Sequence, residues 1–215
     1  MFHFDRISRV AAATVVLTVV ASANAAVSTA HWVPCGSSEG PNSKGLFYST
    51  VTYSYVSGST ATVSVDLSNT TLPADGGYIT GLAVNMQSGV TGMSFVSCTN
   101  ANFLAVSAFT APPFGSFTAG GALGANWIGG GSPNGGIAVG SSAIFTFNIT
   151  GSSAVLAAMS AEYVFGPNSD GNAMAVRFRG GVGDWSDKVL GCATPAPGAV
   201  ALLGVVGLLS ARRRR

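Results

Sequence analysis

The chain has 215 residues, only 8% of them are charged, and its formal net charge is +2. The positive sign comes from the two ends, because residues 26–192 contain four basic and seven acidic residues, a net charge of −3. This middle part has no basic patch, which argues against a nucleic-acid-binding protein and against a polybasic membrane-surface protein.

The first 25 residues are typical of a secretory signal peptide. Two arginines precede a short apolar run at residues 10–21 (VAAATVVLTVVA), and Ala23 and Ala25 fit an A-x-A cleavage site. We expect cleavage to leave a mature chain that begins at Ala26 and folds outside the cytoplasm. The alternative is an uncleaved anchor, but the apolar run is shorter than the ~20 residues that a membrane-spanning helix needs.

Three cysteines follow the predicted cleavage site: Cys35, Cys98 and Cys192. An exported domain can form a disulfide, and three cysteines allow one internal pair with one thiol left over. The pair Cys35–Cys192 would join the two ends of the domain, and Cys35–Cys98 would join the start of the domain to its middle. The sequence slightly favours Cys35 with Cys192, because domain termini often lie close together.

Alternating patterns predict strands from residue 46 onward. Residues 46–56 (LFYSTVTYSYV) and 61–67 (ATVSVDL) alternate with the period of a half-buried strand. The segment Ser57-Gly58-Ser59 between them is typical of a turn, so the two runs are predicted to form a hairpin. Further strands are expected at residues 78–86, 93–98, 103–109, 143–150, 163–165, 173–178 and 188–190.

Residues 110–140 are rich in glycine and proline and lack long alternation. They are either a long excursion over one face of the domain or a pair of weak edge strands with glycine bends. Trp127 lies among glycines in this segment. An aromatic side chain on such a loop can stack on a sugar, although it more often packs the loop onto the core.

Residues 152–162 (SSAVLAAMSAE) predict a short helix, because Leu156 and Met159 are three apart and a serine at the start can cap it. Eight to ten short strands separated by turns predict an all-β fold. We expect a single antiparallel β-sandwich domain, immunoglobulin-like or jelly-roll-like, with one short helix, over residues 26–192.

Few residues could support catalysis. His31 is the one histidine that follows the predicted signal peptide, which argues against zinc catalysis and a Ser-His-Asp triad. A glycoside hydrolase needs two carboxyl groups across a cleft, and the candidates are Asp184 with Asp187 or with Glu162. Seven acidic residues in one domain also produce such proximity by chance, and we predict that the protein is not an enzyme.

One loop has the beginning of a calcium-binding pattern. Asn168, Asp170 and Asn172 place oxygen atoms at alternate positions beside Gly171. The position where an EF-hand has its bidentate acid is occupied by Arg179, so an Asx turn is the favoured interpretation. No other cofactor is predicted.

The C-terminal tail, residues 193–215, has three parts. It begins with a proline motif at Pro195, Ala196, Pro197 and Gly198. Residues 199–211 (AVALLGVVGLLSA) are mostly apolar and too few for a comfortable membrane span, which favours a temporary hold over a permanent tail anchor. The chain closes with a cytoplasmic stop by the positive-inside rule, at Arg212, Arg213, Arg214 and Arg215.

This three-part layout resembles the PEP-CTERM sorting signal of bacterial exported proteins, in a Pro-Ala-Pro variant that lacks the central glutamate. The resemblance implies an exosortase-like enzyme that cuts near the proline motif, a transient stay in the inner membrane, and delivery to the cell surface or the extracellular space. It also implies an association with exopolysaccharide. We therefore expect a non-enzymatic surface or extracellular-matrix protein. The alternative is a carbohydrate-binding module with Trp127, Trp185 and Tyr163 as stacking residues.

Overall fold

β-Strands dominate the structure, a computed structural model that describes residues 26–129 and 132–194. One α-helix, α1 (Ser153–Ala158), and two short 3-10 helices, η1 (Gly40–Asn42) and η2 (Pro133–Gly135), lie between strands. In chain order the strands are β1 (Ala26–Ser37), β2 (Phe47–Tyr55), β3 (Thr60–Asn69), β4 (Gly76–Val84), β5 (Val90–Cys98), β6 (Phe103–Thr110), β7 (Ser116–Leu123), β8 (Ile137–Ala138), β9 (Ser142–Gly151), β10 (Met174–Gly181) and β11 (Asp187–Thr194).

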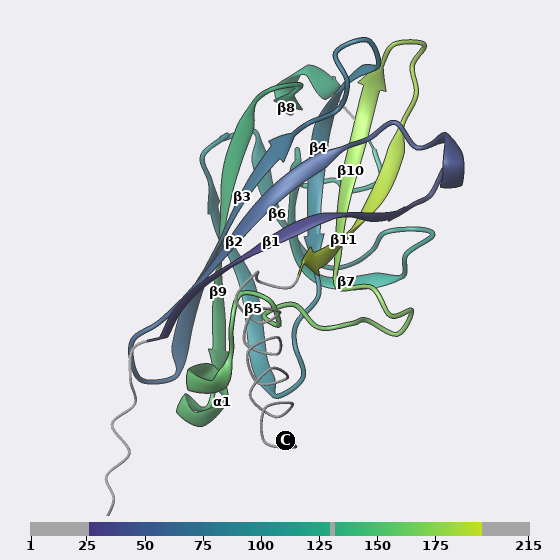
Figure 1. The fold of residues 1–215 in the computed structure, drawn as a ribbon. Helices are drawn as coiled ribbons and strands as arrows, with labels where there is room; N and C mark the ends of the chain where they lie inside the picture. The colour runs from purple at the N-terminus through teal and green to yellow at the C-terminus, as the bar shows by residue number, and fades with distance from the viewer. Residues whose placement is uncertain (1–25, 130–131, 195–215) are drawn as a thin grey trace, which may run out of the picture.

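These strands form one antiparallel sheet with the order β5-β9-β3-β2-β1-β11-β10-β4-β7-β6, and β8 pairs with β4. The sheet curls on itself, so that β4, β6 and β7 lie behind β1, β2 and β3 in Figure 1. The prediction of an all-β antiparallel fold is confirmed. The finer prediction of a two-sheet sandwich is wrong, because the described residues form a single, nearly barrel-shaped sheet of 11 strands.

Strand β1 explains why there is one sheet. Residues 26–32 pair with β2, and residues 31–37 pair with β11, so β1 joins two halves that would be separate sheets in a sandwich. This strand is not predicted from the sequence, because Pro34 and Gly36 interrupt its pattern and are uncommon inside strands. Pro34 lies after the pairing with β2 has ended, in the part of β1 that pairs only with β11.

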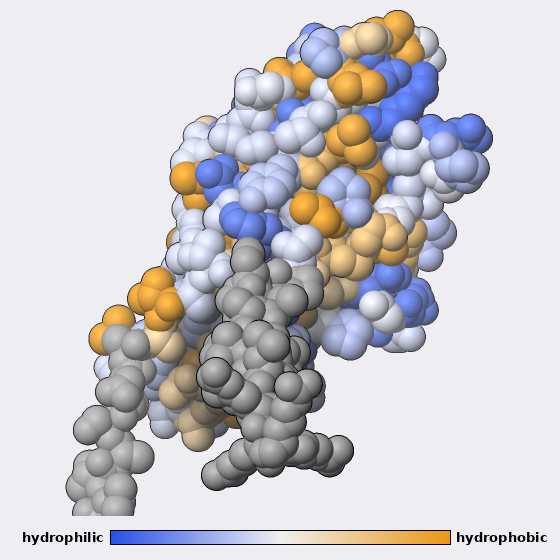
Figure 2. All heavy atoms as spheres, in the orientation of Figure 1, coloured by the Kyte–Doolittle hydropathy of each residue, from blue (hydrophilic) through white to orange (hydrophobic). Residues whose placement is uncertain are grey.

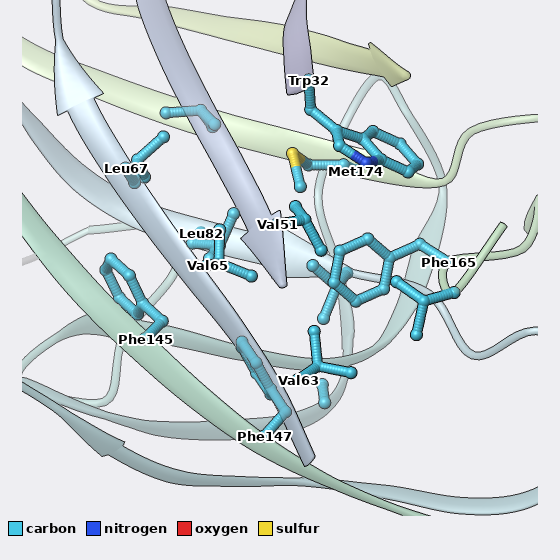
Figure 3. Packing of buried hydrophobic residues seen from close by; sticks show 14 of the residues in the cluster. Trp32, Val51, Val63, Val65, Leu67, Leu82, Phe145, Phe147, Phe165 and Met174 are labelled. Carbon is cyan, nitrogen blue, oxygen red and sulfur yellow. The ribbon is translucent and has the colours of Figure 1, made fainter. Parts of the chain in front are cut away.

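The core fills the inside of the curled sheet. Alternate residues of β3, including Val63, Val65 and Leu67, are fully buried, and they pack with Phe145 and Phe147 of β9. Figure 3 shows these side chains pointing toward one another, together with Trp32 and Phe165. Each such side chain contributes roughly 1.5–3 kcal/mol when it leaves water, so the alternating pattern that predicted the strands also determines which face is buried.

A second, smaller apolar cluster covers the outer face of β4, β7 and β10. It contains Phe117, Trp127, Ala83 and Ala175, and Phe109 packs against it. Residues 110–140 supply most of this cluster, namely Ala111, Phe114, Phe117 and Trp127. Of the two interpretations of this segment, short strands are the closer one, but β7 is an interior strand between β4 and β6.

The predicted local elements are largely confirmed. The hairpin of β2 and β3 turns at Ser57-Gly58-Ser59, and the predicted helix is α1, whose Ser152 hydroxyl accepts a hydrogen bond from the Val155 amide at 3.3 Å. The predicted strand at residues 163–165 is reduced to a single bridge between Met86 and Phe165. The last strand is longer than expected, since β11 runs on to Thr194.

Candidate functional site

A small pocket of about 310 Å³ lies between the β1–β2 connection and the β10–β11 loop. It combines an aromatic ring with acidic, basic and amide side chains, and its lining residues are Glu39, Asn42, Lys44, Trp185, Ser186 and Asp187. Hydrophilic side chains gather at this end of the molecule, over η1 and the tip of β10 at the upper right of Figure 2. A partly exposed aromatic ring beside planar polar groups is a common way to bind a small polar ligand.

The Trp185 ring is held rigidly at the edge of this pocket. Its Nε1 donates a hydrogen bond to the Asp75 carbonyl at 2.8 Å, and the ring contacts Phe178 with centroids 6.4 Å apart. The indole lies directly against the backbone of Gly181, where an added Cβ would come within 1.8 Å of Nε1. Only glycine fits there, so the local sequence fixes the orientation of the ring.

Asp187 forms the floor of the pocket and is only 2% exposed. Its Oδ1 accepts hydrogen bonds from the hydroxyls of Ser37 at 2.6 Å and Ser38 at 3.2 Å, and its Oδ2 accepts one from Ser43 at 2.7 Å. A buried carboxylate is costly unless its oxygens are hydrogen-bonded. These three hydroxyls satisfy it and tie the β1–β2 connection to the start of β11.

Lys44 and Glu39 bring opposite charges to the rim. The Lys44 Nζ lies 3.6 Å from the Asp75 Oδ1, and the lysine side chain is about half exposed. The pocket therefore has two carboxylates of its own, those of Glu39 and Asp187, against one ammonium group.

Comparison with known protein families, with curated proteins and with solved structures finds no match for this chain.

The carboxyl groups proposed for a hydrolase do not share a cleft. Asp187 lines the pocket, but Asp184 lies in an exposed turn and is not among the lining residues. Glu162 follows α1, which lies at the opposite end of the barrel from the β10–β11 loop (Figure 1). The structure does not bring these three residues together.

Trp127 does not offer a face for stacking, because it is only 3% exposed. Its ring covers Gly81 of β4, where a Cβ would lie 2.8 Å from the indole, and it contacts Phe109 with centroids 5.3 Å apart. The Arg177 guanidinium donates to the carbonyls of Trp127 and Ile128. Burial, with a smaller contribution from neighbouring Arg179, lowers the pKa of Arg177 to about 10. Trp127 thus packs its loop onto the sheet, which is the more common role expected from the sequence for such a residue.

The loop considered for calcium is held as an Asx turn. The Asn168 Oδ1 accepts hydrogen bonds from the amides of Asp170 at 2.9 Å and Asn172 at 3.0 Å. The Asn168 Nδ2 donates to the carbonyls of Phe114 at 2.8 Å and Ser116 at 3.0 Å. These bonds dock the loop onto the β6–β7 connection and leave the Asn168 amide oxygen already occupied.

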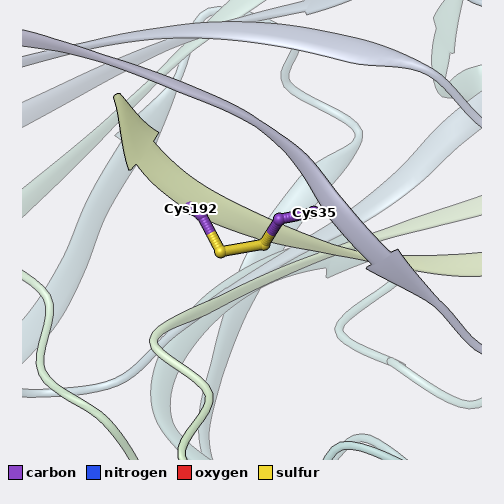
Figure 4. The surroundings of a disulfide bond; sticks show 2 residues. All are labelled: Cys35 and Cys192. Carbon is purple, nitrogen blue, oxygen red and sulfur yellow. A yellow bond between two sulfur atoms is a disulfide. The ribbon is translucent and has the colours of Figure 1, made fainter. Parts of the chain in front are cut away.

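Cys35 and Cys192 form a disulfide with Cα atoms 5.8 Å apart (Figure 4). This is the pairing that the sequence slightly favoured. The register between β1 and β11 shifts between Pro34 and Gly36, so Cys35 is the extra residue of a bulge and its side chain reaches Cys192. Cys98 is a free, half-buried thiol whose pKa is raised by burial.

The predicted signal peptide and the predicted sorting motif, with Pro195, Ala196, Pro197, Gly198 and the arginine run, lie outside the described residues. Over residues 26–129 and 132–194 there is no helix long and apolar enough to cross a membrane.

Trp185 and Asp187 are candidates from the sequence, one for sugar stacking and one for a hydrolase, whereas Glu39, Asn42 and Lys44 are not. These residues lie more than 140 positions away along the chain, and only the pairing of β1 with β11 brings them to the same pocket. No local motif marks them.

Proposed function

We propose that this chain is an exported, non-enzymatic cell-surface or extracellular-matrix protein whose C-terminal tail is a membrane-held sorting signal processed on export. The layout of the tail carries the proposal: a proline motif, thirteen mostly apolar residues and a terminal arginine run follow the domain in that order. The Cys35–Cys192 disulfide supports it, because an exposed disulfide persists in an oxidising compartment outside the cytoplasm.

The position of the tail suits its proposed role. β11 ends at Thr194, directly before Pro195, so a cut near the proline motif leaves the described fold complete. The short apolar segment and the four arginines would hold the precursor in the inner membrane until an exosortase-like enzyme acts.

Mass spectrometry of the exported protein tests this proposal. We expect a mature chain that starts near Ala26 and lacks Arg215. Replacing all four terminal arginines with alanine should leave the C-terminus uncut or the protein mislocalised, whereas Lys44→Ala, which also removes a positive charge, should change neither. Recovery of an exported chain that retains Arg215 would contradict the proposal.

A second candidate function is carbohydrate binding at the Trp185 pocket. The observation that favours it is the fixed, partly exposed indole beside the carboxylate of Glu39 and the amide of Asn42, with the buried Asp187 carboxylate beneath them. The apolar face of the indole can stack on a sugar ring, and the polar groups beside it can then hydrogen-bond to particular sugar hydroxyls. The excess of carboxylates favours a neutral or amino sugar over a uronic acid.

Affinity electrophoresis through exopolysaccharide from the producing culture, with a neutral glucan gel as comparison, tests this second candidate. Trp185→Ala should abolish the retardation, and Tyr163→Ala, which alters a 63% exposed ring that does not line this pocket, should leave it unchanged. Equal retardation of the wild type and Trp185→Ala would remove the candidate.

A further inference from the structure

The two edge strands of the described sheet, β5 and β6, are not joined by a ladder, and the gap between them is called the seam below. β5 pairs only with β9, and β6 pairs only with β7, so over the described residues no ladder joins β5 to β6. The outer backbone edges of these two strands therefore have no strand partner. An unpaired edge is a template for another strand, and natural proteins usually block it with charges, prolines or bulges.

The two edges are not equivalent. The pairing of β5 shifts register twice, between Val90 and Gly92 and between Phe95 and Ser97. Bulges bend a strand and end pairing along its edge. β6 keeps one register with β7 from Phe103 to Thr110 and skips only Ala108, whose φ is 48°. Residues 103–107 are thus a regular edge with no hydrogen-bonded strand partner among the described residues.

Charge is also missing from both edge strands, and the Arg177 guanidinium beside the β6 groove is already bonded to the carbonyls of Trp127 and Ile128. Residues 76–161, which include β4 to β9 and both edges of the seam, contain no Asp, Glu, Lys, Arg or His. A charged partner would find no counter-charge here and would lose hydration on docking. A second copy of the chain presents the same uncharged strand, so pairing copies buries no ion and repels no like charge.

The surface next to β6 is hollowed. A groove of about 660 Å³ lies beside Leu104, Asn102 and Leu123, and an adjoining one of about 410 Å³ lies beside Ser107 and Ile128. Leu104 is 49% exposed and Ile128 is also exposed, although both are aliphatic. In an antiparallel pair of β6 strands, the side chains of one copy can enter the grooves of the other.

We propose that β6 is a self-association edge, at which two copies of this chain pair their β6 strands antiparallel about a twofold axis. The interface is the same patch on both copies, as twofold symmetry requires. It lies apart from the Trp185 pocket, and it stands whether or not that pocket binds sugar. A short strand pair buries less surface than the interface of a stable dimer. The dimer should therefore be weak and should form only at high protein concentration.

Sedimentation velocity of the full chain, in mild detergent that disperses the apolar tail, tests the proposal. We expect the wild type to shift from monomer to dimer with concentration. Leu104→Lys should raise the dissociation constant of the dimer at least about tenfold, because it puts an unpaired charge into the interface. The matched control Leu72→Lys adds the same charge at a 58% exposed loop residue between β3 and β4, and it should leave the dimer unchanged.

Hydrogen exchange then locates the contact. Amides of residues 103–110 should become protected as concentration rises, while those of β2 and β3 stay constant. The proposal is overturned if the wild type stays monomeric, or if Leu104→Lys and Leu72→Lys associate equally. It is also overturned if protection of β6 is independent of concentration and disappears on deletion of residues 199–215, since the chain's own tail would then cover the edge.

Discussion

Removal of the Cys35–Cys192 disulfide should lower the free energy of unfolding by about 5 kcal/mol. The two cysteines are 157 residues apart, so the bond closes a very long loop in the unfolded chain. The loss of chain entropy is worth ~4.7 kcal/mol for a 100-residue loop and grows with the logarithm of length. The folded state should change little, because both cysteines are exposed and the β1–β11 ladder continues on either side of them.

Urea unfolding, followed by far-UV circular dichroism, measures this effect. The double variant Cys35→Ser/Cys192→Ser should unfold at lower urea and with a larger m-value, because its unfolded chain is less compact. The control Cys98→Ser removes the unpaired thiol and should shift stability by less than about 1 kcal/mol. A loss below about 1 kcal/mol in the double variant, with an unchanged m-value, would refute the entropic reasoning.

Three further predictions concern single residues. Burial, with a contribution from Tyr55, raises the pKa of Tyr53 to about 12, so the unfolded phenol ionises first and stability should fall as pH rises from about 10 to 12; Tyr53→Phe should flatten that fall in urea titrations. Asp187→Ala should cost about 2–4 kcal/mol in the same assay, because three serine hydroxyls lose their acceptor, and a cost below about 0.5 kcal/mol would contradict this. Gly181→Ala should displace the Trp185 indole and change its near-UV circular dichroism, and an unaltered spectrum would show that the close contact is not rigid.

Strict alternation made part of the fold readable. In β3 and β9 every second residue is apolar, and the same residues are buried. β1 and β7 were harder, because Pro34, Gly36 and the paired glycines of β7 remove the alternation while tertiary pairing still holds the strands. Period-two patterns mark which face is buried but not whether two buried faces belong to one sheet, so the sandwich and the barrel looked alike.

The sequence predicted only part of the candidate site, because its residues come from two distant segments of the chain. Trp185 and Asp187 are neighbours in a loop with acidic and glycine residues, which drew attention to them. The hydroxyls that satisfy Asp187 come from Ser37, Ser38 and Ser43, and a serine-rich segment far along the chain gives no local signal of that role.

Strand β11 also defines a mechanical path through the molecule. It starts at Asp187 beneath the pocket and ends at Thr194, next to the tail, about 24 Å away along the strand. A pull between a ligand in that pocket and an anchor on the tail would run along this strand. β1 and β10 flank it, so the pull would have to shear two ladders together, and the bond to Cys35 would pass the load on to β1. Two ladders and a disulfide would therefore share any such load.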